Sequence, residues 1–252
     1  MTLVTNRQSG VPERSEKAQR LRLRFARGKE AGQIGHLDLS RIWTEAFEHA
    51  GAAVSYSQGN RPHPRLTLAA GLPMGVTSEA ELLDVVLARR LDPDDLVANV
   101  QPHLPPGLEA LECREVGIGL PSLPSVIRWA EYGVDVPIVE GAPAIPAISA
   151  IEDAVSSFLC LDSLPWEDHR GEKTRRYDLR PLVQELRVEE QCGDTVRLSM
   201  RLRCDAKGVG RPDQVVKALG LGEAARIHRR RLVLAGGSPA RAAWRTRGRF
   251  QA

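Results

Sequence analysis

The side chains best suited to chemistry gather in one short stretch, Tyr56 to Arg65, which reads YSQGNRPHPR. His63 stands between two prolines, with an arginine on each side of that group. Proline fixes φ and glycine permits positive φ, so a stiff loop is predicted. An imidazole, two guanidiniums and two amides on such a loop form a candidate ligand-binding site. Its members are Gln58, Asn60, Arg61, His63 and Arg65.

A second imidazole, His36, stands at the predicted start of a helix, near Asp38 and Arg41. Amides at a helix start can hold phosphate, and a histidine there can act as a general base. The structural alternatives are that His36 packs against its loop and that His63 bonds a backbone carbonyl. His36 and His63 are the candidate catalytic residues.

The sequence contains no self-contained catalytic motif. We find no P-loop, Rossmann glycine fingerprint or nucleophile elbow. The four cysteines are far apart, with no CxxC pair and no zinc spacing, so reduced thiols are expected. The carboxylates Glu79, Glu81 and Asp84 lack a partnered His or Cys, so no metal site is predicted there. No cofactor is expected on this chain, and whether it is an enzyme stays open.

Basic residues are concentrated in the second half, although the formal net charge is only +3. From Arg226 to Arg249 there are eight arginines and no carboxylate. Such clusters suit a phosphate backbone, and a solvated surface is the ordinary alternative. The predicted nucleic-acid-binding residues are Lys173, Arg175, Arg176, Arg180, Arg197, Arg201, Arg203, Arg229, Arg230 and Arg231. RNA is therefore a candidate partner.

The elements that position these side chains follow from the spacing of apolar residues. Residues 20–25 alternate arginine with apolar side chains, as in a half-buried strand. Residues 36–50 have helical spacing, with Asp38 as a possible N-cap and Gly51 at the end. The first half is completed by a short strand over 54–57, extended structure that resumes over 65–68, strands over 81–87 and 108–116 and a helix over 92–104. The order β-α-β-β-α-β is the ferredoxin-like pattern.

The second half repeats that order more loosely. Strands are expected over 132–139, 175–179, 195–204 and 227–234, and helices over 148–161 and 212–219. Within 195–204 the arginines share one face and the apolar side chains the other. The predicted fold class is therefore α+β, with two tandem ferredoxin-like domains built on antiparallel sheets.

A chain of 252 residues suits two domains. The predicted segments are a disordered N-terminus (1–18), a first domain with both histidine motifs (19–118), a linker (119–130), a basic second domain (131–235) and a disordered basic tail (236–252). No apolar run approaches the ~20 residues of a membrane span, and no secretory signal is visible. A cytoplasmic location with no membrane partner is expected.

Five motifs in order carry a family resemblance. They are GHLDLSR at 35–41, YSQG with PHPR within 56–65, LPMGVTSE at 72–79, YDLRP at 177–181 and GRPD at 210–213. Together they resemble the radical-SAM-linked (radical-SAM-associated) family of unknown function. Its members occur as C-terminal domains of cobalamin-binding radical SAM proteins or as free-standing chains. This sequence resembles the free-standing form, because the CxxxCxxC cluster motif is absent.

The loop departs from the family's common SQGFNPHP, because Asn60 and Arg61 take the Phe-Asn positions. An aromatic that would stack or pack there is missing.

The resemblance implies association with a radical SAM protein, and free-standing members tend to be encoded near RNA-processing genes. Any iron–sulfur cluster or S-adenosylmethionine would then belong to the partner. An accessory protein that binds RNA and assists its modification or processing is the favoured interpretation. Two alternatives stay open. One is a metal-free endoribonuclease that uses His36 or His63 as general base, and the other is a protein-only adaptor for a radical SAM enzyme.

At the level of fold alone, tandem ferredoxin-like domains are also similar to the repeat-RNA-processing endoribonucleases of CRISPR systems, which is analogy only.

Overall fold

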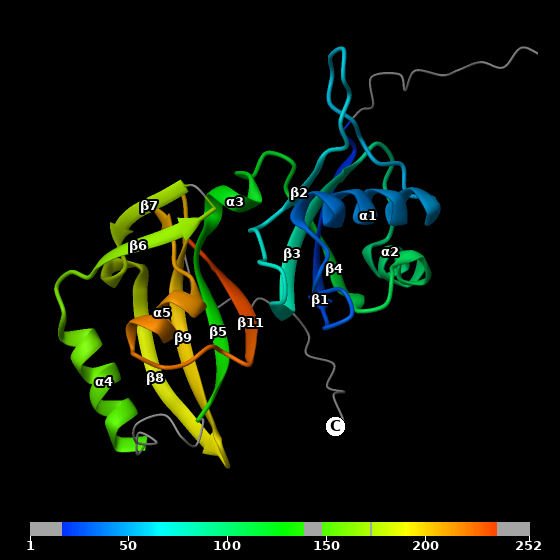
Figure 1. Cartoon of the computed structure of the whole chain (residues 1–252). Coiled ribbons are helices and arrows are strands. Elements are labelled where there is room, and N and C mark those ends of the chain that lie inside the picture. Colours follow the sequence, from blue (N-terminus) through cyan, green and yellow to red (C-terminus); the bar gives the residue numbers. More distant parts are fainter. Residues whose placement is uncertain (1–16, 139–147, 172, 236–252) are drawn as a thin grey trace, which may run out of the picture.

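The computed structural model describes residues 17–138, 148–171 and 173–235. The predicted terminal segments lie outside this range, apart from residues 17 and 18. Helices and strands are interspersed along the described chain, and nine of the strands form one sheet (Figure 1). All but one of the strand pairings in that sheet are antiparallel. The predicted α+β class is confirmed, and the described strands form one large, mostly antiparallel sheet and a separate two-stranded hairpin. Among the described residues, no helix combines the length and apolar character that a membrane crossing requires.

The first half contains four strands and two α-helices. Its elements are β1 (Gln19–Arg27), α1 (His36–His49), β2 (Leu66–Leu68), β3 (Thr77–Leu87), α2 (Pro93–Val100), a 3-10 turn (Gln101–His103) and β4 (Leu108–Val116). The strands lie in the order β4-β1-β3-β2. The apolar positions of β1 pack under α1, where the Phe25 and Trp43 rings lie 5.0 Å apart. The amphipathic pattern thus places α1 and its flanking loops on one face of the sheet.

The opposite face of β1 is buried as well, which the alternating pattern did not predict. Arg20 and Arg22 are 7% and 6% exposed, and both donate to the carboxylate of Asp84. Arg20 also donates to the carbonyls of Leu120 (2.6 Å) and Pro121 (2.9 Å). The chain that leaves the first half is therefore tied to this face by a buried guanidinium.

The second half adds seven strands. Its elements are α3 (Leu123–Val126), β5 (Ile127–Pro137), α4 (Ile148–Cys160), β6 (Pro165–Arg170), β7 (Lys173–Asp178), a 3-10 turn (Arg180–Leu182), β8 (Val183–Cys192), β9 (Thr195–Asp205), β10 (Gly208–Val209), α5 (Pro212–Ala218) and β11 (Arg226–Leu234). The main strands lie in the order β8-β9-β5-β11, and β6 and β7 form a separate hairpin. The segment 119–130, predicted as a linker, contains α3 and the start of β5.

The two halves join through β3 and β11, whose pairing is parallel and short. Its partners are His228 with Thr77 and Arg229 with Ser78. One apolar core lies around α1, and the other lies between the second-half strands, α4 and α5 and also includes Ala69 and Leu82 of the first half. We call the junction between β3 and β11 the seam.

Three local predictions differ from the structure. Gly35, not Asp38, is the N-cap of α1, and Asp38 lies in the first turn, where it pairs with Arg41 at 3.4 Å. The helix predicted to reach residue 104 ends at Val100, and a 3-10 turn that contains a proline follows it. The strand predicted over 54–57 is reduced to two isolated bridges, at Val54 and Tyr56.

Candidate functional site

The predicted loop is a hairpin that rises above the first half (Figure 1, light blue to cyan). Tyr56 bridges Pro64, and the Ser57 amide donates to the His63 carbonyl at 2.9 Å. Gly59 at the tip has φ +126°, which a residue with a Cβ rarely adopts. The Ser-Gln-Gly sequence therefore closes the turn, and the two prolines stiffen the returning arm.

The His63 ring is held by a residue that sequence reasoning did not single out. The Ser57 Oγ lies 2.8 Å from His63 Nδ1 and accepts the His63 backbone N–H at 3.0 Å. The Ser57 Oγ can donate to Nδ1 or accept a proton from it, so this contact orients the ring in either tautomer. His63 is exposed, and Nε2 has no hydrogen-bond partner among the described residues. The predicted bond from the ring to a backbone carbonyl is not found.

The remaining loop residues divide into two groups. Gln58, Asn60 and Arg61 are exposed at the tip. Arg65 instead donates from Nε to the Tyr56 carbonyl at 3.1 Å and so braces the hairpin. The base is anchored by the Tyr56 hydroxyl, which donates to Glu48 on α1. Burial, with help from Glu48, raises the pKa of Tyr56 to about 12, so the phenol keeps its proton.

The structure does not bring His36 to this hairpin. His36 is exposed in the first turn of α1, whereas Glu48, the anchor of Tyr56, lies in the last turn. At 1.5 Å per residue these two positions are about 18 Å apart along the helix. His36 and His63 therefore do not form one catalytic pair.

The arginines of β9 face carboxylates from the neighbouring strands. Arg197 donates to Asp135 at 2.6 Å and also to Glu190. Arg201 donates to Glu131 at 2.6 Å and also to Glu185. These carboxylates lie on β5 and β8, directly across from β9. Much of the positive charge predicted on this face is therefore neutralised within the sheet.

The other basic residues of the second half are also mostly engaged. Arg203 pairs with Asp205 at 3.2 Å, and Arg230 and Arg231 pair with Glu189 and Glu131. Arg180 donates to two backbone carbonyls, Arg176 pairs with Glu167, and Arg175 lies over the Tyr177 ring. Lys173 lies on β7. Among these, Arg175, Arg176 and Arg231 are exposed, and the Arg176 side chain is 80% exposed.

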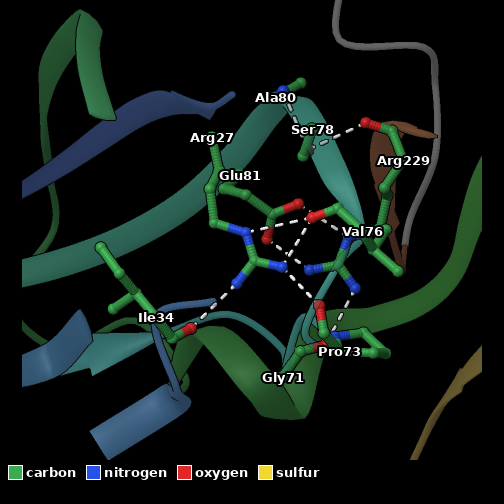
Figure 2. Close-up of polar contacts among 9 residues, drawn as sticks. All are labelled: Arg27, Ile34, Gly71, Pro73, Val76, Ser78, Ala80, Glu81 and Arg229. Carbon is green, nitrogen blue, oxygen red and sulfur yellow. Dashed lines mark hydrogen bonds and ion pairs between the residues drawn. The ribbon is translucent and has the colours of Figure 1, made fainter. Parts of the chain in front are cut away.

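Arg229 does not belong to the predicted nucleic-acid surface, because it is 1% exposed. It lies in the seam (Figure 2), where Nε donates to Glu81 at 2.7 Å and Nη1 to the Gly71 carbonyl at 3.0 Å. Burial opposes the charged form, but the Glu81 carboxylate outweighs it and raises the pKa of Arg229. A guanidinium from the second half is thus paired with a carboxylate from the first.

Arg27 completes this buried cluster, again 1% exposed. Its guanidinium donates to the backbone carbonyls of Ile34 (3.2 Å), Pro73 and Val76 (2.6 Å) (Figure 2). Burial lowers the pKa of Arg27, Glu81 opposes that effect, and Arg229 adds to it. The LPMGVTSE motif therefore supplies two backbone carbonyls, of Pro73 and Val76, that accept hydrogen bonds from Arg27. Glu81 lies two residues after the end of the motif.

A cavity of about 550 Å³ adjoins the seam. Its lining is Ala26, Arg27, Gly28, Lys29, Thr77, Ser78, Glu79, Gln101, Gly107, Leu108, Glu109, Arg226 and His228. Within it His228 Nδ1 lies 2.8 Å from the Thr77 hydroxyl, and Nε2 lies 3.8 Å from the Glu79 carboxylate. We call this cavity the seam pocket.

Burial lowers the pKa of His228, the Glu79 carboxylate works against that shift, and Arg226 and Arg230 reinforce it. A neutral imidazole is therefore favoured near pH 7, and it is able to accept a hydrogen bond or a proton. Sequence reasoning missed His228, because it is about 150 residues from Thr77 and only the β3–β11 pairing brings them together. The one available signal was that the LPMGVTSE motif ends in Thr77, Ser78 and Glu79.

The last two sequence motifs meet in the second half. The Tyr177 hydroxyl donates to Gln214, one residue after the GRPD motif. Arg211 pairs with its neighbour Asp213 at 3.0 Å. Asp178 accepts the amides of Leu164 (2.8 Å) and Arg180 (3.0 Å), so it closes a turn and does not serve an arginine side chain. Across the three described ranges, no three His, Cys, Asp or Glu side chains are grouped as a metal site requires.

Comparison with known proteins gives little beyond a family. No curated protein matches the chain. A chain of a Cbf5–Nop10–Gar1 complex is similar at 11% identity with a TM-score of 0.43, over 83% of this chain and 48% of that one. An unknown protein from Galdieria sulphuraria is similar at 16% identity with a TM-score of 0.24, over 80% of this chain and 89% of that one. Neither likeness is close enough to carry an argument.

A match to a family shows more. The family described as "Uncharacterized protein conserved in bacteria (DUF2344)" matches residues 20–212. These residues include the hairpin, the LPMGVTSE motif and most of the second half. Because the match covers more than half of the sequence, the protein belongs to this family, DUF2344.

Proposed function

We propose that the protein is a cytoplasmic accessory protein that binds RNA and assists its modification or processing beside a radical SAM enzyme. The observation that carries the proposal is the projecting hairpin, in which Ser57 fixes the His63 ring at an exposed position. A group that is already ordered loses little entropy on binding, so its contacts convert efficiently into affinity. The radical SAM association rests on the five sequence motifs.

The chemistry of the tip suits single-stranded RNA. Side-chain amides such as Gln58 and Asn60 pair with base edges, and Arg61 suits a phosphate. All three are exposed, and Arg61 has no ion pair with any other described residue. The arginines of β9 contribute less than their number implies, because they already face carboxylates. The proposed interface therefore centres on the hairpin and adds Arg175 and Arg176, two exposed arginines of the predicted second-half surface.

We further propose that the scaffold consists of two ferredoxin-like halves. The first-half order β4-β1-β3-β2 and the second-half order, read in the opposite direction as β11-β5-β9-β8, place equivalent strands in equivalent positions. Each half also follows the chain order β-α-β-β-α-β once α3, the β6–β7 hairpin and the two-residue strand β10 are set aside. A crystal structure with a different strand order in either half would contradict this assignment.

The test is RNA binding measured by fluorescence anisotropy over a range of salt concentrations. We compare the wild type with Arg61→Ala and with Lys217→Ala, which removes one exposed charge far along the chain. For single strands the slope of log affinity against log salt becomes shallower by about 0.7 for each phosphate that the protein no longer neutralises. Arg61→Ala is expected to make that slope shallower and Lys217→Ala to leave it unchanged. Affinity that does not depend on salt refutes the phosphate interaction.

Two alternatives are decided by parallel measurements. The arrangement of Ser57 and His63 favours His63 over His36 as the general base of a metal-free endoribonuclease. RNA cleaved in EDTA by the wild type, and not by His63→Ala, would establish that activity. The protein-only adaptor would instead be established by two results together. A radical SAM protein would co-purify with this protein after nuclease treatment, and this protein would show no RNA binding.

A further inference from the structure

The seam pocket is separate from the hairpin and is made by both halves. The first half supplies the end of β1 with its loop, the start of β3 and the start of β4, and the second half supplies Arg226 and His228 of β11. The pocket therefore exists only where β11 pairs with β3. A site completed by two halves of a chain is a usual position for a ligand.

Two cationic side chains in the lining are available to a ligand. Lys29 and Arg226 are both exposed, and neither pairs with a carboxylate of the described residues. Arg27 lines the same pocket, but its guanidinium already donates to the carbonyls of the seam. Lys29 and Arg226 are thus the donors that can reach a phosphate.

Two acceptors lie side by side in the same lining. The Thr77 hydroxyl holds His228 Nδ1 at 2.8 Å, and the Glu79 carboxylate lies 3.8 Å from Nε2. A neutral imidazole and a carboxylate both accept hydrogen bonds from hydroxyl groups, and an acidic side chain is a common partner of ribose hydroxyls. Vicinal hydroxyls of a sugar therefore match this pair.

Two further polar residues of the lining, Gln101 and Ser78, are committed elsewhere, and Glu109 is an exposed carboxylate. The Gln101 amide bonds the backbone of Leu108 and Ala110 across the base of β4. The Ser78 hydroxyl donates to the Arg229 carbonyl. The polar side chains of the lining that remain for a ligand are therefore Lys29, Arg226, His228, Glu79 and Glu109. A cavity of about 550 Å³ lies within the usual range for a small-molecule site.

We propose that the seam pocket binds a phosphorylated nucleoside, with Lys29 and Arg226 on the phosphate and His228 and Glu79 on the ribose hydroxyls. The ligand is either a free mononucleotide, which offers both ribose hydroxyls, or the 5′-phosphorylated end of an RNA chain, whose first ribose offers the 2′-hydroxyl alone. This site is additional to the hairpin and does not depend on it.

The experiment is isothermal titration of the purified full-length protein with AMP, CMP, GMP and UMP, with adenosine, with 2′-deoxy-AMP, and with a short RNA carrying a 5′-phosphate or a 5′-hydroxyl. Binding of at least one mononucleotide is expected, at least tenfold tighter than its nucleoside, because charged hydrogen bonds are the stronger ones. Loss of the 2′-hydroxyl is expected to weaken binding about tenfold. Preference for the phosphorylated RNA over the mononucleotide identifies the RNA end as the ligand, and the reverse identifies the free nucleotide.

Matched variants assign the contacts. Lys29→Ala, Arg226→Ala and Glu79→Gln each change an exposed side chain and are expected to weaken mononucleotide binding at least tenfold. Lys217→Ala and the hairpin variant Arg61→Ala are expected to bind as the wild type does. A rise in the thermal midpoint with added mononucleotide, absent in Lys29→Ala, gives a second measurement that does not depend on heat of binding.

Three results would overturn the proposal: no mononucleotide binding at millimolar concentration, equal affinity for adenosine and AMP, or wild-type affinity in both Lys29→Ala and Arg226→Ala. Because RNA binding by the hairpin is measured with Arg61→Ala, loss of one proposal leaves the other standing.

Discussion

The pairing of Arg229 with Glu81 makes a quantitative prediction about how the two halves are held together. The two residues are 1% and 3% exposed, so removal of either leaves a buried charge without its main partner. Breaking a buried ion pair in this way costs about 3–5 kcal/mol of unfolding free energy. The two partners, however, are not equivalent.

Arg27 decides which change is worse. After Arg229→Met, Glu81 still has the charge of Arg27 nearby, so the cost is expected near the low end, about 3 kcal/mol. After Glu81→Gln, Arg27 and Arg229 are left as two buried guanidiniums without a carboxylate, so the expected cost is about 5 kcal/mol. The double variant Glu81→Met with Arg229→Met removes both charges. It is expected to cost at least about 2 kcal/mol less than the sum of the single variants.

The assay is urea unfolding followed by far-UV circular dichroism, with free energies compared at equal slope. Arg197→Met is the matched control, because its side chain is 37% exposed and its pairs with Asp135 and Glu190 lie at the surface. The control is expected to cost about 1 kcal/mol or less. Single-variant costs near that of the control, or additivity of the two changes within about 0.5 kcal/mol, would refute the reasoning.

Three further predictions concern single positions. Alkylation at pH 8 followed by mass spectrometry should modify the exposed Cys160 and Cys192 first, because burial raises the pKa of Cys113 to about 12 and also raises that of Cys204; rapid modification of all four in the folded state would contradict this. Gly107→Ala should lower the unfolding free energy by about 2–4 kcal/mol in urea unfolding, because φ is +83° and the added Cβ would lie 2.6 Å from the Ala31 nitrogen. The control Gly222→Ala, where the added Cβ meets open space, should leave the unfolding free energy nearly unchanged. Because burial lowers the pKa of His228, the unfolded state takes up a proton at a higher pH than the folded state, so the unfolding free energy should fall as the pH drops below about 6.5. His228→Asn should flatten that part of the curve of unfolding free energy against pH. An unchanged curve would show that another group controls it.

Local sequence patterns were sufficient for most elements of the first half. The alternation in β1, the helical spacing in α1 and the acidic first turn of α2 each involve residues close together along the chain. These patterns can therefore be recognised in the sequence without knowledge of the fold. The alternation of β9 was equally readable, and its apolar positions are buried as expected. The stiff hairpin was also predictable, because proline and glycine act on their own backbone angles.

Ion-pair partners that lie on distant strands could not be predicted from such local patterns. The arginines of β9 form a basic surface in the sequence, but β5 and β8 place carboxylates directly across from them. The strand β8 itself was not predicted, because its charged residues obscure any alternation. Charge on one strand therefore says little about surface potential until its neighbours are known.

What the sequence alone determined is the class of fold, most of the first-half elements, the stiff loop and the motifs that accompany it, since each follows from residues close together along the chain. The tertiary structure alone decided the seam, where β11 pairs with β3 across about 150 residues and brings Arg229 to Glu81 and His228 to Thr77. The physical reason is that a parallel pairing between distant strands leaves no periodic signal in either strand. Bringing β3 and β11 together reduces the conformational entropy of the chain between them, and only the formation of both apolar cores offsets that loss.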